Sequence, residues 1–243
     1  MARASKKSRI IFGLVSLVIA LVVSYVLPKL GIDNEYGVHN VTIANTDEIL
    51  EAVGEFSGEP YVVINDNMPF FTEDEIIDVS YEKYGEMDYL ERCTYAEACI
   101  GEDIMPFEER GAIGHVKPSG WHTVKYSFVD GKYLYNRCHL IGYQLTGENA
   151  TRENLITGTR YMNTEGMLPF ENMIADYIKE TGAHVMYRVT PVFKGDNLLA
   201  SGVVMEAFSV EDDGAGICFN VYCYNAQPGV EIDYATGESR EER

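Results

Sequence analysis

The sequence is poor in positive charge: 19 lysines and arginines face 38 aspartates and glutamates, which leaves a formal net charge of −19. This deficit excludes a uniformly basic surface for nucleic acid, so a polyanionic partner would have to be bound by a local group of residues or through a metal ion. Internal repeats and low-complexity linkers are also missing. Hydrophobic residues are not scarce, since they make up 46% of the 243 residues, and this content excludes disorder throughout. The length allows one domain or two small ones.

Cysteine is scarce: the five residues form no CxxC pair and no closed set of zinc ligands, which disfavours a structural zinc site. Cys93 and Cys99 close a short loop and are the most favourable pair for a disulfide outside a membrane. Cys218 and Cys223 stand five residues apart in an expected strand. This odd spacing puts them on opposite faces and argues against a bond between them.

Long hydrophobic runs are confined to one place, residues 10–27, which contain no charged side chain. A helix of this length spans roughly 27 Å, about one hydrocarbon core. Residues 2–9 before it carry four cations and no acid. The pattern predicts a cytoplasmic segment 1–9, a single-pass signal anchor over 10–27 in the cell membrane, and an extracellular remainder. A cleaved signal peptide is the main alternative, and a buried core helix is the other.

The charge of the remaining chain is unevenly distributed. Residues 30–109 carry 2 cations and 21 acids, and residues 164–243 carry 5 cations and 14 acids. Residues 110–163 carry 7 cations and 3 acids, and they form a basic island in an acidic chain. Chance clustering on a solvated face usually explains such runs. This island matters because the best chemical motif lies inside it.

The exported part divides into a tether with an N-terminal helix, residues 28–58, and one extracellular domain, residues 59–243. Hydrophobic residues recur with a helical period in the last of the expected helices, and Gly182 stands where its C-terminal cap belongs. The expected helices begin near Asn45, near Thr72 and at Pro169.

β-rich runs alternate with turn signals in the rest of the domain. Asp130-Gly131 between two such runs predicts a hairpin in residues 123–135, whereas residues 80–120 receive no regular structure. The predicted fold class is α+β, an antiparallel sheet with packed helices. Further strands are expected at residues 60–65, 184–193, 198–208 and 216–224.

Residues 135–171 join the expected hairpin to the last helix and hold the side chains best suited to chemistry. A phosphodiester hydrolase needs a base for water, which a His can supply, and a fixed cation on the phosphate, which an Arg can supply. It also needs a hard metal ion. Mg²⁺ keeps several waters, so one Asn carbonyl and a carboxylate that orients a metal-bound water can suffice. The candidates are Arg137, His139, Asn154, Asn163 and Glu171.

Each candidate also has an ordinary structural explanation. A His near the end of a strand, such as His139, is more often structural than catalytic. Loop Asn residues such as Asn154 commonly form turns, and the helix dipole favours a carboxylate at Glu171. Arg160 is equally compatible with a surface charge. Residue types alone therefore leave the function open.

Two segments resemble a known family. The run NRCHLIGYQLTG, residues 136–147, resembles the D-R-G-H-L motif of the DNA/RNA non-specific endonucleases, which carry a ββα-metal, or His-Me finger, active site. The run ENLITGTRYMN, residues 153–163, resembles the N-x8-N segment of that family. The similarity is closest to the membrane-bound DNA-entry nuclease type. Two departures occur: Asn136 replaces the first Asp of the motif, and Cys138 replaces its Gly.

The resemblance implies a role for each candidate. His139 is the general base, Asn163 is the protein ligand of Mg²⁺, with Mn²⁺ as a second candidate, and Glu171 supports the water shell of the metal. Asn154 helps to hold the active site, and Arg137 matches the Arg of the motif. The departure at Asn136 removes a charge near the site, and Cys138 puts a thiol beside the base.

The resemblance further implies Mg²⁺-dependent hydrolysis of DNA without sequence specificity, with RNA as a second candidate substrate. Lys117, Arg152 and Arg160, together with Lys125, are candidate phosphate contacts, and each is equally compatible with a solvated position. A non-catalytic surface interaction module that retains a nuclease-like fold is the alternative. DNA uptake, scavenging and competition would all use the same chemistry, so the sequence does not separate them.

Overall fold

A six-stranded antiparallel sheet forms the centre of the molecule. The computed structural model describes residues 46–242, which belong to one compact unit. All neighbouring strands of the sheet run antiparallel, which confirms the predicted class. In spatial order the strands are β1 (Tyr61–Val63), β8 (Cys218–Tyr224), β7 (Gly202–Ser209), β6 (Val185–Val192), β3 (Ala96–Ile100) and β2 (Tyr81–Tyr84).

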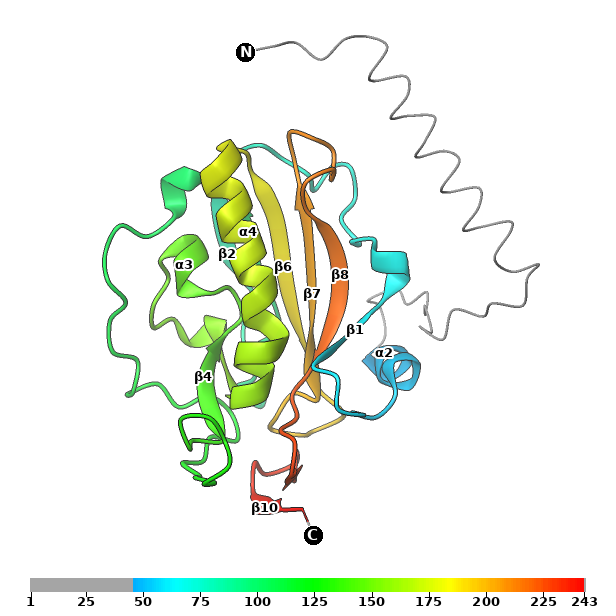
Figure 1. Cartoon of the computed structure of the whole chain (residues 1–243), viewed down its shortest axis with the longest axis vertical. Coiled ribbons are helices and arrows are strands. Elements are labelled where there is room, and N and C mark those ends of the chain that lie inside the picture. The colour runs from blue at the N-terminus through cyan, green and yellow to red at the C-terminus, as the bar shows by residue number, and fades with distance from the viewer. Residues whose placement is uncertain (1–45, 243) are drawn as a thin grey trace, which may run out of the picture. The chain divides into compact units, whose positions relative to one another are not determined.

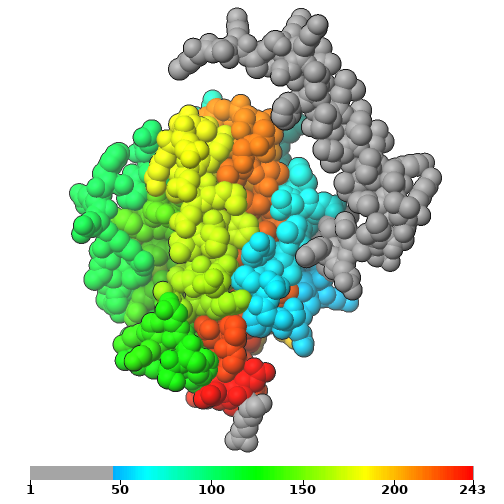
Figure 2. Space-filling view, in the orientation of Figure 1, coloured from blue at the N-terminus to red at the C-terminus, as the bar shows by residue number. Residues whose placement is uncertain are grey.

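Helix α4, Leu168–Thr181, crosses one face of this sheet in front of β6 and β7 (Figure 1). Pro169 lies in its first turn, where no N–H is needed, and Gly182 ends it with a φ of 69°. Both ends match the prediction. Figure 2 shows α4, in yellow, packed between the green segment on one side and the cyan segment on the other. Its apolar stripe joins the main hydrophobic core through Phe170, Ile174, Ala175 and Ile178.

The opposite face of the sheet carries a second, smaller hydrophobic cluster. Helix α2, Thr46–Val53, packs there, and its Ile49 is buried with Tyr222 and Tyr224 of β8. The helix is the one expected to begin near Asn45. Because α2 packs on the sheet, it joins the domain that we predicted to begin at residue 59.

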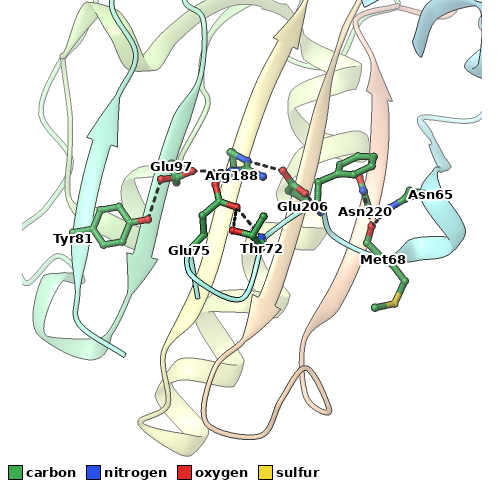
Figure 3. A network of polar contacts seen from close by, with 10 residues as sticks. Asn65, Met68, Thr72, Glu75, Tyr81, Glu97, Arg188, Glu206 and Asn220 are labelled. Atoms are coloured by element: carbon green, nitrogen blue, oxygen red, sulfur yellow. Dashed lines mark hydrogen bonds and ion pairs between the residues drawn. The ribbon is translucent and has the colours of Figure 1, made fainter. Parts of the chain in front are cut away.

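A row of polar side chains crosses the same face along the strand register. Glu97, Arg188, Glu206 and Asn220 lie opposite one another on β3, β6, β7 and β8 (Figure 3). Arg188 bridges two carboxylates: its Nη1 lies 3.0 Å from Glu97 Oε2, and its Nε lies 2.7 Å from Glu206 Oε1. Glu206 also accepts the backbone N–H of Phe70 at 2.5 Å, which ties the segment just before Thr72 to the sheet.

A ββα unit contains α4 as its helix. Strand β4 (Tyr135–His139) pairs antiparallel with β5 (Leu155–Thr159), and α4 follows β5 through a π-helix, η6 (Met162–Met167). This is the element order that the resemblance implies. The remaining elements are η3 (Asn65–Asn67), η4 (Glu102–Ile104), α3 (Tyr143–Thr146), η5 (Arg152–Asn154), β9 (Val230–Ile232) and β10 (Ser239–Glu241).

Residues 123–135 form a turn as predicted but not a full hairpin of two strands. One antiparallel bridge joins Lys125 to Tyr133, and Gly131 and Lys132 make the turn with φ values of 65° and 68°. The chain that follows enters β4, whose partner is β5 and not the preceding run. Leu134 bonds to both neighbours, because its N–H donates to Val124 O at 3.0 Å and its O accepts Arg160 N–H at 2.7 Å, so the chain passes from the short hairpin to β5 at this residue.

Two strands of the central sheet, β2 and β3, lie in the region to which we assigned no regular structure. Strand β3 is rich in alanine, and β2 has two charged residues between two tyrosines, so neither shows the alternation typical of a strand. Their pairing with each other and with β6 forms them. The helix expected near Thr72 is a single turn, in which Glu75 N–H donates to Thr72 O at 3.0 Å.

The predicted disulfide between Cys93 and Cys99 is wrong, because all five cysteines are free thiols. The Cys93 thiol lies 3.3 Å from the carbonyl of Leu155, whereas the Cys99 thiol lies 3.1 Å from that of Ile77. Strand β3 carries the chain away between them at roughly 3.3 Å per residue. Burial raises the pKa of both thiols to about 12, so they stay protonated.

The N-terminal predictions fall on residues that the structure does not describe. The basic segment 1–9, the anchor 10–27 and the first part of the tether 28–58 all lie before residue 46. Within residues 46–242, no helix combines the length and apolar character needed to cross a bilayer.

Candidate active site

An open cleft of about 710 Å³ lies where β4 meets the start of α4. Five of the predicted site residues line it: Arg137, His139, Arg160, Asn163 and Glu171. They come from a strand, the end of a second strand, the π-helix and α4, and the ββα unit brings them together. Other lining residues used below are Arg110, Trp121, Tyr133, Asn136 and Gly142.

His139, the last residue of β4, is held in one tautomer. Its Nε2 lies 2.9 Å from the backbone carbonyl of Asn149, which can only accept, so Nε2 carries the proton. Its Nδ1 therefore presents a lone pair and lies 3.3 Å from Nη2 of Arg110. Burial lowers the pKa of His139 to about 4, the Asn149 carbonyl opposes this, and the Arg110 charge adds to it. The imidazole is neutral at pH 7 and suited to accept a proton.

Asn163 sits in the π-helix, whose extra residue per turn re-aims side chains relative to an α-helix. Its Oδ1 accepts the Cys138 thiol at 3.0 Å. Burial raises the pKa of that thiol well above its usual value, so Cys138 is a neutral hydrogen-bond donor here. Cys138 faces Asn163 and the core, whereas His139, one residue on, faces the cleft. The thiol thus orients the amide of Asn163 and lies on the other side of β4 from the base.

Glu171 is buried in the first turn of α4 against Gly142. A Cβ atom on residue 142 would lie 2.6 Å from Glu171 Oε2, so only glycine leaves room for this carboxylate. Burial raises the pKa of Glu171 to about 7, and the Gly142 N–H and the Arg110 charge limit the rise. The carboxylate lies close to Arg110 as well as to the cleft.

Arg137 braces the wall of the cleft. Its guanidinium donates to the carbonyls of Val116 and Gly114, the latter at 2.8 Å, and stacks on Trp121 at 4.0 Å from the ring centroid. Two of its five N–H donors and its stack on Trp121 therefore hold this segment in place.

Asn154 does not line the cleft. It is fully buried, and its side-chain amide is used twice by one residue: Oδ1 accepts Ile141 N–H at 2.9 Å, and Nδ2 donates to Ile141 O at 3.0 Å. Ile141 follows His139 by two residues. This clamp holds the chain just after the base, so Asn154 is a positioning residue.

Two of the three predicted phosphate contacts are placed outside the cleft. Lys117 is exposed and does not line it, and Arg152 pairs with Glu91 at 3.1 Å on an exposed surface. Lys125, the fourth cation considered, lies 4.4 Å above the Tyr133 ring and is also outside the lining. Arg160 alone of these four lines the cleft, because it follows β5 directly.

Arg110 is the site residue that sequence reasoning missed. It lies 29 positions before His139 in a segment without regular structure. Its positive charge lowers the pKa of both His139 and Glu171. The one signal in the sequence is that the basic island begins at residue 110.

The donor set of the cleft fits a hard cation. Among residues 46–242, no three His, Cys, Asp or Glu side chains gather as a metal cage. The cleft is instead lined by Asn163 and Glu171, whose side chains carry oxygen donors, and Asn163 Oδ1 also accepts the Cys138 thiol. Oxygen donors in small number suit Mg²⁺ or Mn²⁺, which retain bound water, better than a closed zinc site.

Around a ββα unit, one cleft gathers a neutral His, an Arg, an amide and a carboxylate, an arrangement that suits hydrolysis of a phosphodiester. Residues 73–211 match the family model of the DNA/RNA non-specific endonucleases. Because this match spans more than half of the chain, the protein belongs to that family, as the resemblance indicated. It is an endonuclease, and the alternative of a non-catalytic surface module is not supported.

Known proteins agree with this assignment. The chain is 25% identical over 260 residues to a deoxyribonuclease of Streptococcus dysgalactiae subsp. equisimilis, covering 82% of this chain and 78% of that protein. The structure of the Sda1 nuclease with a bound zinc ion matches with a TM-score of 0.65 and 25% identity, over 76% of this chain and 97% of that one. NucA from Streptococcus agalactiae with a magnesium ion bound shares the fold, with a TM-score of 0.67 and 24% identity over 75% and 88% of the two chains.

Proposed function

We propose that this protein is an exported, membrane-anchored endonuclease that hydrolyses DNA with Mg²⁺ and without sequence specificity, with RNA as a second substrate. The observation that carries the mechanism is the orientation of His139. Its Nε2–H is fixed on Asn149, and its unprotonated Nδ1 lies 3.3 Å from Arg110 Nη2, in the cleft that Asn163 and Glu171 also line.

His139 acts as the general base. Its Nδ1 takes a proton from a water molecule while the water oxygen forms a bond to phosphorus. The bond from phosphorus to the leaving oxygen breaks, and that oxygen takes a proton from solvent. The Asn149 carbonyl stabilises the imidazolium that forms, because it accepts the Nε2 proton in both states.

Arg110 places a positive donor beside the base. Its Nη2 lies 3.3 Å from Nδ1, so a phosphate oxygen next to the attacking water falls within reach of the guanidinium. Burial and, with it, this charge keep the pKa of His139 low, so the imidazole is neutral and able to accept a proton.

Asn163 would hold the metal through Oδ1, and Glu171 would orient its bound water. When bound, Mg²⁺ would neutralise charge that develops on the phosphate and the leaving oxygen. Mn²⁺ is the second candidate, because it accepts the same oxygen donors. Sda1 has been solved with zinc and NucA with magnesium, which supports a divalent ion in this family.

The test of this chemistry is cleavage of supercoiled plasmid DNA by the purified extracellular part. Activity should vanish in excess chelator and return with Mg²⁺. Asn163→Ala should lose the activity that Mg²⁺ restores and keep a melting temperature close to wild type, because this side chain makes one hydrogen bond to a thiol. Full cleavage in excess chelator would contradict the proposed role of Asn163.

The proposed location rests on the sequence. Four cations in residues 2–9 precede the uncharged run 10–27, which favours an N-terminus inside the cell and the domain 59–243 outside. Protease added to intact cells should therefore digest the domain. Protection of the domain until the cells are lysed would contradict this placement, and a mature protein that begins after residue 27 would indicate the cleaved signal peptide.

A further inference from the structure

One arginine that lines the cleft forms an ion pair with a carboxylate. Arg160 lines the cleft, and its Nε and Nη2 both lie on Asp130 Oδ2, at 3.0 and 2.7 Å. Among the described residues that line the cleft, the other two arginines have different partners. Arg110 faces His139, and Arg137 donates to backbone carbonyls.

Both backbones of this pair are well fixed. The N–H of Arg160 donates to Leu134 O at 2.7 Å, and Val129, beside Asp130, is buried. The turn residues after Asp130 adopt positive φ, and Lys132 N–H closes the turn on Val129 O at 2.8 Å. The turn therefore delivers the Asp130 carboxylate to one place, the edge of the cleft where Arg160 stands.

The side chains of the pair, in contrast, are solvated. The side chain of Asp130 is 78% exposed and that of Arg160 is 35% exposed. Ion pairs of this kind contribute little to stability, and two donors that share a single carboxylate oxygen leave the other carboxylate oxygen in solvent. An incoming phosphate presents the same charge and the same acceptor geometry to a guanidinium. A phosphate can therefore replace the carboxylate at low cost.

We propose that Asp130 occupies the phosphate-binding side of Arg160 in the free enzyme and is displaced by a backbone phosphate of the nucleic acid. Asp130 is thus a residue that sets substrate affinity, and Arg160 is the phosphate contact that it covers. The inference rests on the proposed function, since it takes the cleft to be the nucleic-acid site. Neither residue is needed for proton transfer at His139.

The test compares DNA binding by the wild type, Asp130→Asn, Arg160→Ala and the double variant. The probe is a short fluorescent DNA duplex, bound at low salt with all metal chelated, so that no cleavage occurs. Asp130→Asn should lower Kd by about two- to fivefold, the range expected when one exposed ion pair no longer competes. Arg160→Ala should weaken binding, and in its background Asp130→Asn should change nothing.

Glu231→Gln is the matched control. Glu231 forms the same kind of exposed pair with Arg240, at 2.6 and 2.8 Å, and neither residue lines this cleft. The variant removes one negative charge, as Asp130→Asn does, and should leave Kd within error of wild type. Thermal melting should show all variants folded, because each changed side chain is at least partly exposed.

Three results would overturn the proposal: an unchanged Kd in Asp130→Asn, an equal gain in the Arg160→Ala background, or an equal gain in Glu231→Gln. Kinetics with Mg²⁺ give a second readout, in which Asp130→Asn should lower KM and leave kcat unchanged. A wild type that binds the duplex but does not cleave it with Mg²⁺ would contradict the proposed function, while the binding comparison would still decide the role of Asp130.

Discussion

His139 illustrates how one backbone contact can prepare a side chain for catalysis. The Asn149 carbonyl accepts the proton of Nε2 and leaves Nδ1 as the basic atom. Burial then keeps the imidazole neutral, because the pKa of His139 falls to about 4. Burial and the Arg110 charge thus lower the pKa of His139, and the Asn149 contact, which opposes them, fixes the tautomer.

Replacing His139 by alanine should lower kcat by roughly 10²–10⁴-fold, the usual contribution of general acid–base catalysis. DNA binding should change little, because the phosphate contacts come from other residues. Single-turnover cleavage and duplex binding measure the two effects. His122→Ala is the matched control, since His122 also bonds a backbone carbonyl, at 3.1 Å from Thr236 O, but does not line the cleft. A folded His139→Ala protein that cuts at the wild-type rate would refute the mechanism.

The pH dependence of kcat/KM should report the environment of His139. The base is active when neutral, and its pKa lies below the usual 6.5, so the acid side of the profile should fall below pH 6.5. Arg110→Ala should move that side to higher pH, because removing a neighbouring positive charge favours the imidazolium. Arg240→Ala, which removes an exposed arginine outside the cleft, should leave the profile in place. A profile that is the same in wild type and Arg110→Ala would contradict this coupling.

Among the elements, the ββα unit positions the site. Strand β4 carries the base, the π-helix carries Asn163, and α4 carries Glu171. The chain between β4 and β5 is held by the side-chain amide of Asn154, whose Oδ1 accepts the N–H of Ile141 and whose Nδ2 donates to the C=O of Ile141. The unit therefore depends on a buried polar clamp as well as on apolar packing.

Asn154→Ala should lower the free energy of unfolding by about 1–3 kcal/mol, because the N–H and C=O of Ile141 lose their partners in a buried place. Turnover of the folded fraction should also fall, since the chain after His139 is released. Asn225→Ala is the control, because Asn225 is equally buried and bonds Thr159 N–H at 2.8 Å, yet it holds β5 and not the chain after the base. Urea unfolding and single-turnover kinetics separate the two effects, and equal loss of turnover in both variants would argue against a specific clamp.

At the scale of the whole molecule, the sheet separates the site from a polar network. The cleft and α4 lie on one face, and the row from Glu97 to Asn220 lies on the other (Figure 3). Glu206 in this row is fully buried and depends on Arg188 for its charge partner. The face with the polar network therefore contributes to stability, and the face with α4 carries the candidate site.

Arg188→Ala should destabilise the protein by about 3–5 kcal/mol, because it leaves a buried carboxylate without its partner. The kcat of the folded fraction should stay near wild type, since the network does not reach the cleft. Denaturant unfolding with cleavage measured well below the transition checks both statements. Arg240→Ala, which breaks an exposed pair, should leave the stability close to wild type. A large loss of turnover in folded Arg188→Ala would show that the two faces are coupled.

Local patterns were sufficient wherever the determining interactions are close in the chain. Pro169 and Gly182 set the ends of α4, and β-rich runs between turn signals placed β6, β7 and β8. The family resemblance predicted that His139, Asn163 and Glu171 share a site, and all three line one cleft because the ββα unit that joins them is contiguous in sequence.

Contacts between distant segments decided the rest. Strand β3 forms through pairing with β6, about 90 residues on, and β2 forms through pairing with β3. Arg110 reaches His139 across a loop without regular structure, while Arg152 turns to Glu91 on an exposed surface. The charge of an arginine can be read from a sequence, but its partner depends on which carbonyl or carboxylate the folded chain brings within hydrogen-bond distance.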